Sequence, residues 1–287
     1  MVLKKPQMKS NSSSLMREII IKPKTGWQLI DWREIKEYKD LFYFLILRDV
    51  KALYKQTILG FSWAILRPFI TMVIFQLVFN KLAKISTDGS PGPIFYYSGL
   101  VPWMYFSSSL SRSTNSLITG AGIFTKVYFP RLVLPIVPCL ASLVDFAIAM
   151  TITFILLLVY GLTPTIWILF LPFLIFVMFL TASGLGLWLS ALAVQYRDIP
   201  YGVQFLISIL MWISPVIWST NQLPTEYRIY YGLYPMAGVI EGFRSALYGI
   251  SPMPWDLIGM GTISATFLFI SGAYYFKRKE RIFADVA

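Results

Sequence analysis

The chain has 287 residues, of which 56% are hydrophobic and only 14% are charged, and its mean hydropathy is +0.64. A soluble domain carries charge on about a quarter of its residues, so this composition excludes soluble, disordered and collagen-like chains. The single cysteine, Cys139, cannot form an internal disulfide, and the sequence contains no histidine for an imidazole-based triad or metal site. We therefore expect an all-α membrane protein that crosses the bilayer several times and binds no metal.

The N-terminal part of the chain is predicted to stay on the cytoplasmic side. Residues 1–30 begin with a polar, serine-rich stretch that has no apolar core of a signal peptide, and they are expected to form a flexible tail. Residues 31–59 are predicted to form an amphipathic interface helix, because its seven consecutive apolar residues, 41–47, are too few to cross a membrane. This helix could lie on the lipid surface or dock against a partner.

Six charge-poor segments are long enough to span a hydrocarbon core of about 30 Å. The charge-free stretch 146–196 is too long for one crossing, and the turn-forming residues 161–164 divide it. The predicted spans are 60–81, 94–118, 132–160, 165–195, 202–219 and 256–276.

The distribution of lysine and arginine predicts the orientation. An even number of spans places both termini on one side, and most basic residues fall there, including those of a basic tail at 277–287. The opposite side holds only Lys81, Lys84, Arg228 and Arg244. Both termini are therefore expected in the cytoplasm, and the net charge of +11 reflects this bias and attraction to anionic lipid, with no role for nucleic acid.

Two short cytoplasmic connections, 119–131 and 195–201, combine an aromatic residue or a proline with charges. They suit docking into a cleft on a partner. Ordinary helix turns with basic side chains that extend to the interface are the alternative.

The connection 221–255 on the far side is predicted to form two short re-entrant helices punctuated by prolines, which indicates a pore or gate. Glu241 and Arg244, three residues apart, are expected to neutralise each other on one helix face. The aromatic residues near this side could form an interface belt or line a conduit and stack on sugar rings. The candidates for the conduit are Tyr96, Tyr97, Trp103, Tyr105, Phe106, Trp212 and Trp218.

Three charges fall inside the predicted spans. Arg67 and Arg112 lie near the cytoplasmic boundary, where their side chains can reach the interface. Asp145 is deeper, and a structural pair with an arginine is favoured over a protonated carboxyl or a proton relay. In the fourth span, small residues at four-residue spacing (Ala182, Gly186 and Ser190) predict close helix packing.

The sequence has no phosphate-binding Gly-x-x-x-x-Gly-Lys-[Ser/Thr] loop and no Gly-x-Ser-x-Gly motif. The chain is therefore not expected to be an enzyme or to bind a cofactor. Energy for uphill transport would come from a partner or from an ion gradient.

Over about residues 30–287 the sequence resembles the membrane-spanning subunit of bacterial ABC exporters for lipid-linked polysaccharides such as O-antigen, capsule and teichoic acid. The stretches that carry the resemblance are RDVKALYKQTILGFSW at 48–63 with Arg67-Pro68, SGLVPW at 98–103, KVYFPR at 126–131, Arg197-Asp198 and SPV at 214–216. Where the family often has Asn-Pro before the second gate helix, this chain has Tyr234-Pro235.

The resemblance implies a homodimer with two cytoplasmic ATPase subunits, which would hold ATP and Mg²⁺, in the bacterial inner membrane. It implies a lipid-linked glycan moving through a channel between the protomers. The implied docking residues are Arg48, Lys51, Tyr54, Gly122, Lys126, Phe129, Pro130, Arg131, Arg197 and Asp198, and the implied gate residues are Tyr227, Tyr231, Tyr234, Glu241 and Arg244. Alternatives are an ABC exporter of a drug or glycolipid, a membrane-embedded glycosyltransferase, and a passive channel or scaffold.

Overall fold

The computed structural model describes residues 38–55, 60–124 and 129–280, and in these ranges all regular structure is helical, as predicted. The elements in chain order are α2 (Lys39–Tyr54), α3 (Ser62–Phe75) continued by the π-helical η1 (Gln76–Leu82), α4 (Gly92–Phe124), α5 (Val133–Val159), η2 (Ile166–Phe170), α6 (Leu171–Gln195), α7 (Ile199–Ile213), η3 (Thr220–Gln222), α8 (Thr225–Gly232), α9 (Pro235–Tyr248) and α10 (Trp255–Lys279).

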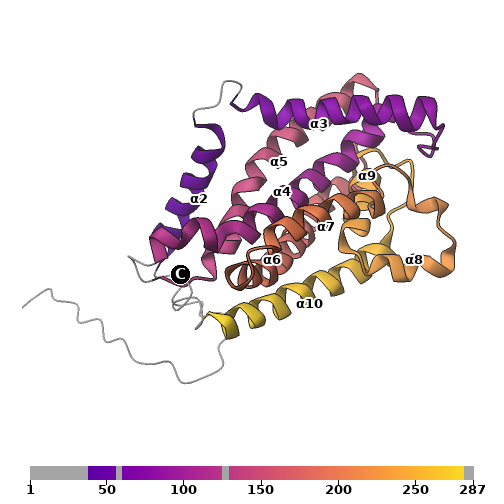
Figure 1. The fold of residues 1–287 in the computed structure, drawn as a ribbon. Coiled ribbons are helices and arrows are strands. Elements are labelled where there is room, and N and C mark those ends of the chain that lie inside the picture. Colours follow the sequence, from indigo (N-terminus) through magenta and orange to yellow (C-terminus); the bar gives the residue numbers. More distant parts are fainter. Residues whose placement is uncertain (1–37, 56–59, 125–128, 281–287) are drawn as a thin grey trace, which may run out of the picture.

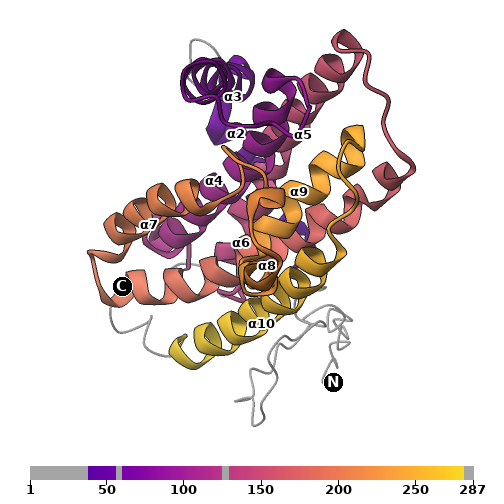
Figure 2. The ribbon, with the colours of Figure 1, turned by 90° about the vertical axis from the view of Figure 1, so that its right-hand side faces the viewer.

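The long helices run side by side, and α2 crosses their direction at one end of the bundle (Figure 1). We call this the α2 end; it also holds the start of α5 and the end of α10. The opposite end, the α8 end, holds η1 and α8. Seen from the α8 end, α9 lies in the middle of the bundle and α3 at its edge (Figure 2).

Four of the six predicted spans coincide with helices long and apolar enough to cross a membrane. These are Ser62–Leu82, Val133–Val159, Ile166–Gln195 and Trp255–Lys279. The break between the second and third of them falls at Gly161, whose positive φ of 65° ends α5 as the predicted turn requires.

The other two predicted spans stay predictions, for different reasons. Helix α4 has 33 residues, but its half-buried face is polar and includes Ser107, Ser108 and Asn115, which lowers its hydropathy. Helix α7 has 15 residues and ends at Ile213, so the last six residues of the predicted span 202–219 lie beyond the helix. Pro215 explains this early end, because the residue before a proline disfavours the helical conformation.

The ends of the chain also differ from expectation. Within the predicted interface helix 31–59 the structure contains the helix α2, and its position at a membrane interface stays a prediction. Residues 31–37 and 56–59 lie outside the described residues, as does the tail 1–30. The predicted tail 277–287 begins as helix instead, since Lys277, Arg278 and Lys279 form the last turn of α10. Basic residues there are stabilised by the negative end of the helix dipole.

Close helix packing forms the centre of the bundle. The predicted stripe of Ala182, Gly186 and Ser190 is buried, and a Cβ on Gly186 would lie 2.1 Å from the Ser113 hydroxyl of α4, which confirms its packing role. A second close approach joins α6 to α10, where a Cβ on Gly184 would lie 2.6 Å from the backbone nitrogen of Phe269. All fourteen residues of α9 are buried between these helices.

Candidate functional site

The three segments predicted to dock a partner meet at the α2 end. Leu45 of α2 packs with Phe129 before α5 and Phe276 of α10 in one apolar cluster. Lys279 donates a hydrogen bond to Gln195 at 3.5 Å, which places the α6–α7 connection beside the end of α10. The structure therefore brings these segments together, as one docking surface requires.

Not every predicted docking residue projects from this surface. Lys51, Gly122, Arg197 and Asp198 are exposed, and Arg48, Tyr54, Pro130 and Arg131 are half-buried. Lys126 lies outside the described residues. Phe129 corrects the prediction, because its side chain is buried in the apolar cluster and is not available to a partner.

The C-terminal end of α2 is held to the bundle by a polar contact. The Tyr54 hydroxyl donates a hydrogen bond to Asp145 on α5, and the Tyr54 ring stacks on Phe61 with centroids 4.0 Å apart. Partial burial, and then the Asp145 carboxylate, raise the pKa of Tyr54 well above its usual value. The phenol therefore stays a hydrogen-bond donor at physiological pH.

Asp145 also pairs with Arg112, which confirms the predicted structural pair. The Arg112 Nη2 and Asp145 Oδ2 atoms lie 3.6 Å apart, and both side chains are about a third exposed. They line a cavity of about 290 Å³ between α2, α3, α4 and α5 that Arg67 also lines. Because Tyr54 of α2 reaches Asp145, this carboxylate lies at the level of the crossing helix and opens to the cavity.

Most of the aromatic residues predicted to line a conduit are buried inside the protomer. Five rings of α4 are less than 5% exposed and belong to the main apolar core: Tyr96, Tyr97, Trp103, Tyr105 and Phe106. They pack the bundle and do not line an open surface of the protomer, which corrects the prediction for them. Trp212 of α7 is 65% exposed and contacts Phe79 edge-on at 6.3 Å, and Trp218 is half-buried.

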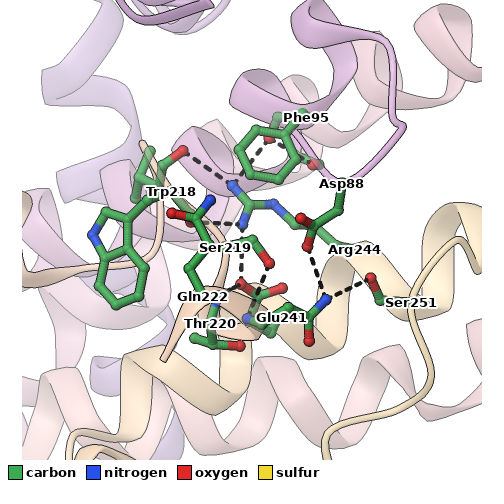
Figure 3. Close-up of polar contacts among 12 residues, drawn as sticks. Asp88, Phe95, Trp218, Ser219, Thr220, Gln222, Glu241, Arg244 and Ser251 are labelled. Atoms are coloured by element: carbon green, nitrogen blue, oxygen red, sulfur yellow. Dashed lines mark hydrogen bonds and ion pairs between the residues drawn. The ribbon is translucent and has the colours of Figure 1, made fainter. Parts of the chain in front are cut away.

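A buried arginine organises the α8 end (Figure 3). Arg244 pairs with Glu241 at 3.3 Å, as predicted, and their side chains are 3% and 7% exposed. Its guanidinium donates to the carbonyl oxygens of Val216 at 3.0 Å and Phe95 at 3.2 Å and lies 3.6 Å from the Phe95 ring centroid. Glu241 accepts a hydrogen bond of 2.9 Å from the Thr220 backbone nitrogen. This network joins α9 to α4 and to the loop after α7.

Two of the tyrosines assigned to the gate, Tyr231 in α8 and Tyr234 just after it, form hydrogen bonds to the end of α7 and the start of the loop that follows it. Tyr231 donates to the Ile213 carbonyl oxygen at 2.6 Å, and the Tyr234 and Ser214 hydroxyls lie 2.8 Å apart. Tyr227 is exposed. The helices predicted in 221–255 are present as α8 and α9, and their re-entry into the membrane stays a prediction.

Several of the side-chain contacts described above could not be predicted from the sequence. Tyr54 was predicted to dock a partner, and its contact with Asp145 depends on how α2 folds against α5. The carbonyl acceptors of Arg244 are backbone atoms of the distant residues Phe95, Val216 and Trp218. Only the polar contact between residues of one helix turn, Glu241 and Arg244, could be read from spacing.

Comparison with known proteins identifies the family to which this bundle belongs. The model of the ABC-2 type transporter family matches residues 40–248. The chain belongs to this family. ABC-2 membership and four apolar helices describe a multi-pass membrane protein, which confirms the resemblance found in the sequence.

Similar proteins cover more than four fifths of the chain. The chain is 26% identical over 251 residues to the O-antigen export system permease protein RfbA of Myxococcus xanthus, which covers 86% of this chain and 96% of that protein. The RfbA protein of Klebsiella pneumoniae is 24% identical over 248 residues, with coverages of 86% and 95%. The polysialic acid transport protein KpsM of Escherichia coli is 25% identical over 244 residues, with coverages of 82% and 92%.

Proposed function

We propose that this chain is the permease subunit of an ATP-driven exporter that moves a lipid-linked polysaccharide across the bacterial inner membrane. The observation that carries the proposal is the match over most of the chain to O-antigen and polysialic acid export proteins. Both termini would lie in the cytoplasm, with six spans and the α2 end facing that side.

Energy would come from two cytoplasmic ATPase subunits that bind ATP and Mg²⁺, because the chain has no phosphate-binding loop of its own. Their docking surface would be the α2 end, where Lys51, Arg197 and Asp198 are exposed. A movement of the ATPase there would be transmitted to α5 through the contact between Tyr54 and Asp145.

The passage would lie between two copies of the chain, with α3 and α7 as its walls. Both helices expose large apolar side chains, including Phe69, Ile70, Phe205 and Trp212. Exposed aromatic rings such as Trp212 can stack on sugar rings of many kinds, which suits a long and variable cargo. At the far side, α8 and α9 would close the passage.

Charge reversal at the α2 end tests this function. Arg197→Glu should reduce ATPase copurification and surface glycan by at least about tenfold, which corresponds to a loss of roughly 1.4 kcal/mol in docking. Lys81→Glu is the matched control, because Lys81 is also exposed but lies in η1 at the α8 end. It should leave both measurements near wild type.

Other outcomes would identify a different function. Normal glycan export by the Arg197→Glu variant would remove the docking assignment. Transport of a drug or glycolipid in place of a polysaccharide would identify a small-substrate exporter. Sugar transfer by the purified chain without an ATPase would identify a glycosyltransferase, and movement of cargo without ATP would identify a channel.

A further inference from the structure

The cavity at the α2 end is lined by two arginines, Arg67 and Arg112, which have no role in the proposed docking or passage. It occupies about 290 Å³ between α2, α3, α4 and α5. This is near the lower end of small-molecule sites, which measure about 300–1,000 Å³. It is large enough for a headgroup and far too small for a polysaccharide. The residues that give it chemical character are Tyr54, Trp63, Arg67, Ser108, Arg112 and Asp145.

The charges in the cavity do not balance. Arg67 and Arg112 supply two guanidinium groups, and Asp145 supplies the one carboxylate among the described lining residues. Arg112 is held loosely, at 3.6 Å from the Asp145 oxygen and 3.4 Å from the Ser142 hydroxyl. Arg67 has no ion-pair partner among the residues that the structure describes. Arg67 is exposed, so solvent reaches its guanidinium group, and the described lining residues of the cavity carry a net charge of plus one.

The anion that best fits this cavity is phosphate. Guanidinium groups bind phosphate oxygens through paired hydrogen bonds, and two arginines at one cavity can share a single phosphate or diphosphate. The surroundings indicate that this phosphate belongs to a lipid. Trp63 lines the cavity, and Phe61 stacks on Tyr54, which also lines it. Their side chains are 49% and 57% exposed, so they can contact a hydrocarbon tail.

We infer that the cavity binds a phosphate-bearing lipid headgroup, and that the bound phosphate competes with Asp145 for Arg112. This inference rests on the proposed function, in which such a headgroup joins the glycan to its lipid. Because Asp145 also accepts the hydrogen bond of Tyr54, withdrawal of Arg112 changes the contact that holds the end of α2. Binding in the cavity thereby changes how the end of α2, the helix that docks the ATPase, is held.

Binding to the complete exporter complex in phosphatidylcholine nanodiscs tests this inference. The probe is a polyprenyl diphosphate, and the readouts are its binding isotherm and the rate of ATP hydrolysis. Arg67→Gln and Arg112→Gln should each weaken binding by roughly tenfold or more, because each removes a charge-assisted contact to phosphate. Arg228→Gln changes a half-buried arginine that pairs with Asp256 at the α8 end; it is the control and should bind normally.

Asp145→Asn gives the most decisive result. If phosphate competes with Asp145 for Arg112, this variant should bind the diphosphate more tightly, whereas a variant with a damaged site should bind it more weakly. Removal of the competing carboxylate should strengthen diphosphate binding severalfold and raise ATP hydrolysis at low probe concentration. Weaker binding in a folded Asp145→Asn variant, checked by its thermal unfolding, would overturn the competition. Unchanged binding in both arginine variants would overturn the site itself.

Matched probes identify the source of the phosphate. A preference for polyprenyl diphosphate over phosphatidylglycerol supports a carrier lipid, and equal binding supports a site for membrane phospholipid. Equal binding of inorganic diphosphate would overturn the contribution of the lipid tail. If binding depends on the two arginines but the protein exports no glycan, the proposed function is contradicted and this inference is not. If the protein exports glycan normally but neither arginine substitution changes diphosphate binding, only this inference is contradicted.

Discussion

Two arginine–carboxylate pairs lie in different parts of this bundle and in opposite environments. Arg244 and Glu241, on α9, are almost completely buried, and the arginine also donates to backbone carbonyl oxygens. Arg112 and Asp145, on α4 and α5, are about a third exposed and border a cavity. The two pairs have the same chemistry, but desolvation of the charged groups costs much more in the buried pair than in the partly exposed pair.

The difference shows what each pair can do. A buried ion pair needs further hydrogen bonds to its remaining donors and acceptors. Both Nη atoms of Arg244 donate to backbone carbonyl oxygens, which fixes the geometry of the α8 end, although its Nε atom has no hydrogen-bond partner among the described residues. A pair with solvent access can exchange one partner for another at little cost. Arg112 is therefore the arginine that can accept a new ligand, whereas Arg244 holds a fixed position.

The largest expected effect comes from breaking the buried pair. Arg244→Met leaves Glu241 charged and unpaired and should reduce the free energy of unfolding by about 3–5 kcal/mol. Denaturant titration in mixed detergent micelles measures this change. Arg228→Gln removes an arginine from the exposed pair with Asp256 and should cost about 1 kcal/mol or less. Equal losses in the two variants would show that burial does not distinguish the pairs.

A smaller effect should follow when the buried guanidinium is displaced but kept. A Cβ on Gly99 would lie 2.8 Å from the Arg244 Nη2 atom, so Gly99→Ala should shift the guanidinium away from its carbonyl partners. We expect a loss of about 1–3 kcal/mol in the same titration, typical of overpacking. Gly259→Ala in α10, where nothing lies within 4 Å, should be neutral or slightly stabilising. Unchanged stability of the Gly99→Ala variant would mean that the network tolerates displacement.

The smallest effect is expected at the open pair. Asp145→Asn should change the free energy of unfolding by about 1 kcal/mol or less, because solvent screens its interaction with Arg112. The asparagine oxygen can still accept the hydrogen bond of Tyr54. A loss as large as that of Arg244→Met would show that the open pair is a structural support, and the comparison between the two pairs would fail.

Sequence reasoning succeeded where the relevant interactions lie within one helix or one turn. Four spans were found from their lack of charge, and the pairing of Glu241 with Arg244 from their spacing. It failed where a feature depends on tertiary packing. Phe129 is assigned to a docking surface because its loop combines an aromatic residue and a proline with charges and because the family resemblance implies it, but its ring is buried in the cluster formed when α2 folds against the bundle.

Two further errors differ in whether the sequence contains their cause. The span predicted at 202–219 was extended through Ser214-Pro215 because the stretch carries no charge, although the proline ends the helix. The aromatic residues of α4 were assigned to a conduit by their type alone. Ring type does not indicate whether a ring faces the bundle, and the structure places all five in the core.

Helix α3 rests on the other helices through few residues. Of its fourteen side chains, only Pro68 and Met72 are fully buried; five are half-buried, and the others are exposed. A helix with so few internal neighbours takes its position from whatever lies outside the protomer, whether acyl chains or a second subunit. The shape of this flank is therefore decided by the assembly in the membrane, and an isolated chain in detergent should show its greatest variability there.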